Sequence, residues 1–103
     1  MIKARHKFNA TAVKKDKICY ASQKEFKYSL YLDSLKSKGD VLGYLSQVPV
    51  RFKCGSKYVM DFLVFYSDGS CEGIEVKGFE TETWKLKKKL FDDEYEWLTL
   101  RIV

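Results

Sequence analysis

The apolar positions near the middle of the chain predict two adjacent strands. Residues 58–66 are apolar or aromatic apart from Asp61, and residues 71–77 continue as a second strand. The two segments flank the turn sequence 67–70 (SDGS), and Asp-Gly between two such segments is typical of a β-hairpin. We therefore expect an antiparallel pair of strands at the centre of the fold.

A helix is predicted before this hairpin. Ser22 and Glu25 fit the capping-box pattern Ser-x-x-Glu, so the helix should begin at Ser22 and run to about residue 37. Gly39 then provides the C-terminal cap. Helical spacing predicts a stripe that faces the core, made of Phe26, Leu30, Tyr31 and Leu35.

A second helix is predicted over residues 83–92, with Thr81 or Thr83 as its N-cap. Its Leu86 and Leu90 lie four residues apart and should face the core. Lys85, Lys88 and Lys89 share another face of this helix.

Two further segments complete the predicted sheet. Residues 41–53 read as one strand or two short strands, and Pro49 favours an edge position or a bulge there. Residues 98–103 read as a final strand, which a right-handed crossover would place parallel to the 71–77 strand. The order of elements predicts an α/β fold with a mixed central sheet flanked by helices.

The length of 103 residues predicts one domain, and an apolar fraction of 46% argues against disorder. Residues 1–21 form a basic arm, with a short hairpin expected near Lys15; the arm fits either contact with phosphates or a solvated terminus. The net charge of +5 favours a polyanionic partner, although a merely soluble basic protein also fits.

Cysteine usage and hydropathy indicate the cellular compartment of the protein. The three cysteines form no CxxC or Cys/His cluster, so we expect no zinc site and a reducing cytoplasm. No apolar segment reaches the length of a membrane span, so we expect no membrane partner.

Candidate chemistry lies in the central hairpin. Asp61 stands in an otherwise apolar strand, and Glu75 and Lys77 share one face of the next strand. Two nearby carboxylates repel unless a cation lies between them, which favours Mg²⁺ bound by Asp61, Glu75 and the Val76 carbonyl. Glu25 is the candidate for a second metal. The alternatives are a surface salt bridge for the hairpin and a purely capping role for Glu25.

These residues resemble the PD-(D/E)XK, or restriction-endonuclease-like, nuclease superfamily. The segment 59–62 (VMDF) stands where the family has its P-D-F/Y motif, and 75–78 (EVKG) matches its E-V-K-G core. The chain is similar to phage endonuclease I-type Holliday junction resolvases and to a family of small phage proteins. The matching stretches of the latter are 8–11 (FNAT), 22–25 (SQKE), 61–62 (DF), 75–78 (EVKG) and 86–91 (LKKKLF).

The resemblance implies a Mg²⁺-dependent DNA endonuclease, with Mn²⁺ able to substitute. Its fold would be a restriction-endonuclease-like core over residues 22–103. The catalytic residues carried over are Glu25, Asp61, Glu75 and Lys77, and the metal ligands are Asp61, Glu75, Val76 and Glu25. The expected DNA contacts are Arg5, Lys7, Lys14, Lys15, Gln47, Lys85, Lys88 and Lys89.

The expected substrate is branched DNA in phage recombination or replication, cut by a homodimer in the host cytoplasm, because two symmetric cuts need two sites. A nicking or restriction-type nuclease on ordinary duplex DNA is the main alternative. A non-catalytic DNA-binding module that keeps the fold is another, and a structural or inhibitory protein is the third.

Overall fold

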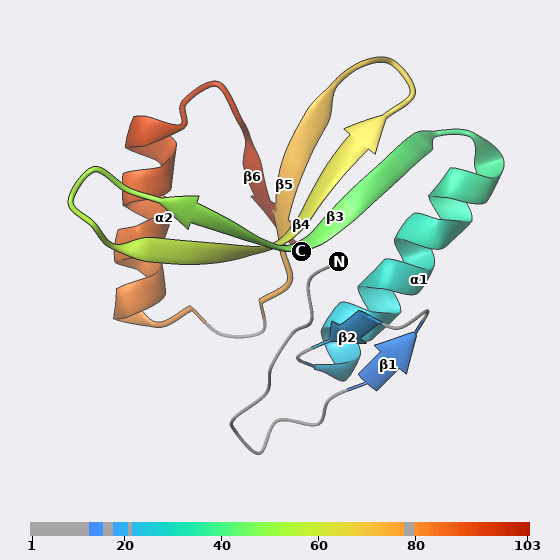
Figure 1. Ribbon diagram of the computed structural model, residues 1–103, viewed down its shortest axis with the longest axis horizontal. Coiled ribbons are helices and arrows are strands. Elements are labelled where there is room, and N and C mark those ends of the chain that lie inside the picture. The colour runs from blue at the N-terminus through green and yellow to red at the C-terminus, as the bar shows by residue number, and fades with distance from the viewer. Residues whose placement is uncertain (1–12, 16–17, 21, 78–79) are drawn as a thin grey trace.

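The computed structural model describes residues 13–15, 18–20, 22–77 and 80–103 (Figure 1). Two helices and six strands follow one another in this part of the chain, which confirms the α/β class. Their order is β1 (Val13–Lys15), β2 (Ile18–Tyr20), α1 (Gln23–Lys38), β3 (Val41–Arg51), β4 (Lys57–Tyr66), β5 (Cys71–Glu75), α2 (Glu82–Glu94) and β6 (Leu100–Ile102).

The main sheet has four strands in the order β3-β4-β5-β6. The first two pairings are antiparallel, whereas β5 and β6 are parallel, so the predicted parallel pairing of the last strand with the 71–77 strand is confirmed. β3 is one long strand, and Pro49 lies on it at the edge of the sheet, where its missing N–H costs no ladder bond on the open side. β1 and β2 pair separately as a short antiparallel hairpin, as expected for the arm.

The predicted turn between β4 and β5 is present. Gly69 has a left-handed φ of 91° and donates its N–H to the Tyr66 carbonyl. The Asp68 carboxylate accepts hydrogen bonds from both the N–H and the hydroxyl of Ser70. Glycine and aspartate therefore close this hairpin by the conformations and hydrogen bonds that each favours.

Both caps of α1 are confirmed, but its predicted core stripe is partly wrong. Ser22 accepts a hydrogen bond from the Glu25 N–H, and Gly39 ends the helix with a φ of 88°. Leu30 and Tyr31 are 46% and 51% exposed, whereas Phe26 and Leu35 are partly buried. The fully buried face is instead Glu25, Ser29 and Leu32. Two of these three residues are polar, so apolar spacing predicted Phe26 and Leu35 correctly but not Leu30 and Tyr31.

The predicted orientation of α2 is also partly wrong. Thr81 is the N-cap, but Leu86 is 60% exposed, and Leu90 is only partly buried. Trp84 and Phe91, which lie two turns apart, are the buried residues of this helix. Aromatic side chains bury more apolar surface than leucine, so they determine which face packs.

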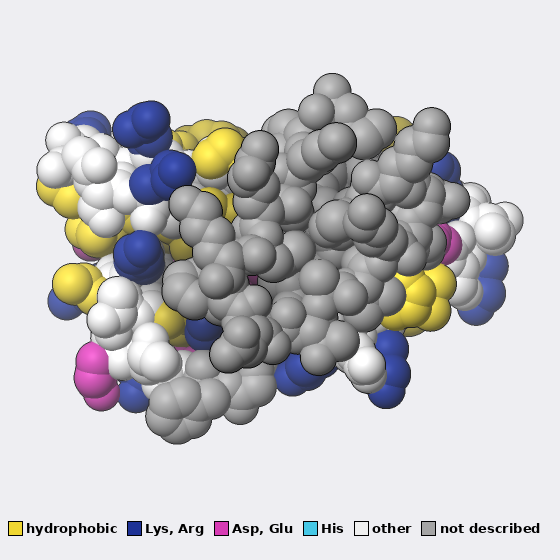
Figure 2. All heavy atoms as spheres, turned by 60° about the horizontal axis from the view of Figure 1, so that its bottom comes forward, with side chains coloured by type: hydrophobic (Ala, Val, Ile, Leu, Met, Phe, Trp, Pro, Cys, Tyr) yellow, Lys and Arg dark blue, Asp and Glu magenta, His cyan; other side chains and the backbone are white. Residues whose placement is uncertain are grey.

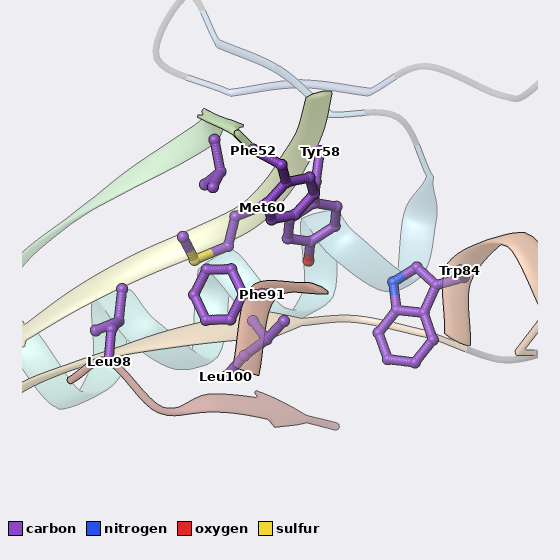
Figure 3. Close-up of a cluster of buried hydrophobic side chains, with 8 residues drawn as sticks. Phe52, Tyr58, Met60, Trp84, Phe91, Leu98 and Leu100 are labelled. Carbon is purple, nitrogen blue, oxygen red and sulfur yellow. The ribbon is translucent and has the colours of Figure 1, made fainter. Parts of the chain in front are cut away.

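The two helices cover opposite faces of the main sheet (Figure 1). On the α1 face, Leu32 packs with strand residues that include Phe62 and Ile74. On the α2 face, eight residues form a second cluster, seven of which are labelled in Figure 3. The eight are Val50, Phe52, Tyr58, Met60, Trp84, Phe91, Leu98 and Leu100.

β4 changes the face that it presents in the middle of its length. Met60 and Phe62 would share a face in a regular strand, yet they belong to different clusters. Gly73 pairs with Leu63, which regular alternation would place on the opposite face of β4 from Met60. A Cβ at Gly73 would nevertheless lie 2.3 Å from the Met60 Sδ. The change occurs at Asp61, so the candidate carboxylate lies where the two cores meet.

Candidate active site

Three neighbouring strands bring the central residues of the site into one row. The pairing of Phe62 with Ile74 places Asp61 directly opposite Glu75. On the other side of Asp61, the β3–β4 register places Gln47 opposite it. Asp61 and Glu75 are thus cross-strand neighbours, as the sequence analysis expected.

Gln47 has an unusual backbone conformation at this position. Its φ of 55° is the only positive value at a non-glycine residue in the described part of the chain. The left-handed region is unfavourable for residues with a Cβ and is often found at functional sites. The Gln47 side-chain amide donates a hydrogen bond to Glu25 Oε2 over 2.6 Å. This strand irregularity therefore joins α1 to the row of site residues.

Glu25 enters the site from the first turn of α1 and is only 5% exposed. Its main-chain N–H is bound by Ser22, while its carboxylate accepts the hydrogen bond from Gln47. The residue thus belongs to the helix cap through its backbone and to the candidate site through its side chain.

The carboxylate of Asp61 is held by the neighbouring strand. Its Oδ2 accepts a hydrogen bond of 2.8 Å from the Val76 N–H, directly beyond the end of β5. The bond fixes one carboxylate oxygen of Asp61 beside the backbone of Val76, whose carbonyl was the predicted third ligand.

Glu75 is 6% exposed and has two partners. The Tyr58 hydroxyl donates a hydrogen bond to Glu75 Oε1, and the Lys77 Nζ lies 3.9 Å from Glu75 Oε2. The Lys77 side chain is 24% exposed, and its ammonium lies 5.4 Å from the centre of the Trp84 ring. Lys24 reaches the same place and donates to the Lys77 carbonyl over 3.2 Å.

Burial and mutual repulsion raise the pKa values of these acids. Burial raises the pKa of Asp61 to about 8, and the charges of Glu25 and Glu75 add to the rise. Burial likewise raises the pKa of Glu25 to about 7, with a further contribution from Glu75. The pKa of Glu75 is raised by burial, against the opposing effects of Tyr58 and Lys77. Without a cation, the three carboxyl groups cannot all be ionised cheaply at neutral pH.

The Trp84 indole is a further polar group at this place. Among the described residues, its buried Nε1–H has no hydrogen-bond partner. It is nevertheless close enough to lower the pKa of both Tyr58 and Glu75. We take the N–H to face these two groups without a well-formed bond to either.

The oxygen donors fit a hard divalent cation in chemical type. Among the described residues, no three His, Cys, Asp or Glu side chains are grouped so that they could hold a metal ion by themselves. The set that fits is therefore Asp61 and Glu75 with main-chain oxygen and water, since Mg²⁺ commonly keeps several waters and uses one or two carboxylates. A cation there would also offset the repulsion that raises the pKa of Asp61.

The predicted DNA contacts are only partly placed. Arg5 and Lys7 lie outside the described residues, and of Lys14 and Lys15 only the backbone, in β1, is described. Gln47 lies within the site and contacts Glu25.

The lysines of α2 are partly engaged with acids of the same helix. Lys88 lies 2.6 Å from Asp92 and Lys85 lies 3.8 Å from Glu82, while Lys89 is exposed. Figure 2 shows the face toward which the N-terminal ends of both helices point. Lys and Arg side chains predominate over Asp and Glu on its described part.

Sequence reasoning missed Tyr58, Trp84 and Lys24 as parts of the site. Lys24 precedes the helix acid, and Trp84 follows the Glu-x-Lys strand at the start of the lysine-rich helix, so proximity to the motifs was an available signal. No such signal existed for Tyr58, because regular alternation would put it on the face away from Glu75.

Comparison with known proteins gives a family without a described activity. The family model described as "Protein of unknown function (DUF1064)" matches residues 5–103, and the chain belongs to this family. Searches of the curated proteins and of the solved structures found no match. Neither helix of the described residues is long and apolar enough to cross a membrane.

Proposed function

We propose that this member of the DUF1064 family is a Mg²⁺-dependent DNA endonuclease with a restriction-endonuclease-like core. The observation that carries the proposal is the row in which Asp61 lies opposite Glu75, beside the Lys77 ammonium, with Glu25 joined to that row by Gln47. A fold has no structural need for three coupled acids of raised pKa, because each charge is costly to bury. A site that binds a cation and a phosphate does need them.

Each residue has a role that follows from its contacts. Asp61 and Glu75 would hold the metal, together with the Val76 carbonyl, and Mn²⁺ should substitute for Mg²⁺ there. Glu25, which Gln47 holds in place, is the candidate ligand for a second ion. A bound divalent cation would supply a water of lowered pKa and offset negative charge on the scissile phosphate.

Lys77 is the residue that would act on the phosphodiester itself. Its ammonium is partly exposed and faces Glu75, so it can donate a hydrogen bond to the attacking water or to an oxygen that gains negative charge. Lys24, bound to the main chain at Lys77, would add a second positive charge near the phosphate.

The substrate part of the proposal rests on the resemblance to junction resolvases and on the positive charge. Branched DNA cut by a homodimer in the cytoplasm is the favoured substrate and setting. Nicking of ordinary duplex DNA is the alternative within the same chemistry.

The test is a cleavage assay with Mg²⁺ on four-way junction, flap, single-stranded and linear duplex DNA, compared side by side. EDTA and Asp61→Asn should each abolish cleavage, while Asp93→Asn, which removes an exposed carboxylate on α2, should not. Cleavage of the junction alone supports the resolvase function, and equal cutting of duplex supports the alternative. Binding of DNA by the wild type without any cleavage would refute the nuclease and leave a DNA-binding module.

A further inference from the structure

Trp84 occupies a rigid position where α2 begins. Its main-chain N–H donates to the N-cap Thr81 over 3.1 Å, and its side chain is 6% exposed. The ring belongs to the α2-side cluster that contains Tyr58 and Phe91 (Figure 3). Because the cap and the core both fix this residue, its ring can serve as a fixed surface for a flexible side chain beside it.

The ring face meets the Lys77 ammonium. The distance of 5.4 Å from Nζ to the ring centre lies within the range for a cation–π interaction. Lys77 also lies 3.9 Å from Glu75, a distance too long for a strong charge-assisted hydrogen bond. A lysine has a long flexible stem, so the ring adds a second contact that restricts the ammonium.

The indole N–H of Trp84 is a second group of this side chain that is directed toward the site. Figure 3 shows the indole nitrogen on the side of the ring that faces Tyr58, whose hydroxyl binds Glu75. Within the described residues, this buried N–H has no well-formed partner. A buried donor without a partner is costly, and the acceptors that this N–H faces are the Tyr58 hydroxyl and the Glu75 carboxylate bound to it.

We propose that Trp84 is a positioning residue of the site. Its ring holds the Lys77 ammonium, and its N–H is the hydrogen-bond donor that orients the Glu75 carboxylate. The packing of α2 against the sheet would then determine where both groups stand. The consequence for catalysis rests on the proposed function, whereas the contacts themselves do not.

The contacts can be tested in metal-free protein through the indole N–H resonances of a ¹⁵N-labelled sample. The chain has two tryptophans, and the exposed Trp97 gives an internal reference. Lys77→Met should shift the Trp84 indole resonance and leave that of Trp97 in place. The matched control, Lys85→Met, removes a lysine next to Trp84 in sequence whose ammonium pairs with Glu82, and it should shift neither.

Two results would overturn the contacts. The first is an unchanged Trp84 resonance in Lys77→Met, and the second is an equal shift in Lys85→Met. Lys77→Gln is the second variant, to be used if Lys77→Met loses the dispersed spectrum of the folded protein.

The catalytic consequence needs a separate measurement. Trp84→Phe keeps an aromatic face but removes the N–H, and it should lower kcat by about tenfold with little change in KM for DNA. An unchanged kcat, or a loss confined to KM, would show that Trp84 does not position the site. If the wild type cleaves no DNA, the proposed function fails, while the resonance shift still decides the contacts.

Discussion

Asp61→Asn should make the metal-free protein more stable at alkaline pH while it abolishes cleavage. Asparagine keeps an oxygen that can accept the hydrogen bond from the Val76 N–H, and it occupies nearly the same volume. What it removes is a buried carboxyl that must lose its proton as the pH rises. The substitution thus isolates the electrostatic cost of the candidate site from its packing.

The size of the effect follows from proton linkage. The pKa of Asp61 is raised from an ordinary value of 3.8 to about 8, so over this interval the folded protein binds a proton that the unfolded chain has lost. Stability due to this group is therefore full below about pH 4 and is lost as the pH rises through about 8. Each tenfold shift in the ionisation constant corresponds to about 1.4 kcal/mol, which sets a ceiling of about 5–6 kcal/mol.

The expected gain is smaller than this ceiling, because part of the shift in the Asp61 pKa comes from the charges of Glu25 and Glu75. Those two acids also have raised pKa values and share protons with Asp61. We expect Asp61→Asn to raise the free energy of unfolding by about 2–3 kcal/mol at about pH 8.5 and by less than about 0.5 kcal/mol at about pH 4.

The assay is urea unfolding in EDTA at both pH values, followed by circular dichroism, with Asp93→Asn as the exposed Asp-to-Asn control. Mg²⁺ at about 100 times its Kd should then stabilise the wild type by about 2.7 kcal/mol and the variant by much less. Equal stability of variant and wild type at alkaline pH would refute the buried-carboxylate reasoning. Stabilisation of both proteins by Mg²⁺ to the same extent would place the ion elsewhere.

Three further tests, each centred on one residue, examine the surroundings of the site. Tyr58→Phe removes a donor from the buried Glu75 carboxylate and should cost about 1–2 kcal/mol in urea unfolding at neutral pH, so an unchanged midpoint would contradict that hydrogen bond. Gln47→Ala should lower the free energy of unfolding. Gln47→Gly should be about 1 kcal/mol more stable than Gln47→Ala, because glycine adopts a positive φ without strain. The reverse order of the two variants would refute a strained backbone at this position. Gly73→Ala should cost about 1–3 kcal/mol because its Cβ would lie 2.3 Å from the Met60 Sδ, and a double-mutant cycle with Met60→Ala should be non-additive.

Local signals account for the parts of the fold that the sequence predicted well. The Asp-Gly turn at 68–69, the Ser22 cap and the Gly39 terminus each depend on residues that are close in sequence. The parallel pairing of β6 with β5 follows from the connection through α2, because a strand that returns after a helix normally runs parallel to the strand before it. These features needed no knowledge of tertiary packing.

The helix faces could not be predicted as well, because polar residues occupy the buried side of α1. Glu25 and Ser29 are buried together with Leu32, and a hydrophobic stripe drawn through Leu30 and Tyr31 therefore points outward. Glu25 is buried because Gln47 meets it from a strand that is distant in sequence. Buried polar residues at the candidate site thus interrupt the apolar pattern on which the prediction depended.

The same reasoning explains why the acids of the site were predictable and their partners were not. Asp61 and Glu75 stand out because charge is costly inside an apolar strand, and that signal is present in the sequence itself. Tyr58 reaches Glu75 only because β4 changes its exposed face beside Asp61, opposite the left-handed Gln47. This change of face has no local signature in the sequence, because neither Asp61 nor Gln47 is a glycine. The irregularity that supports the site is therefore also the reason that alternation along β4 fails to predict its neighbours.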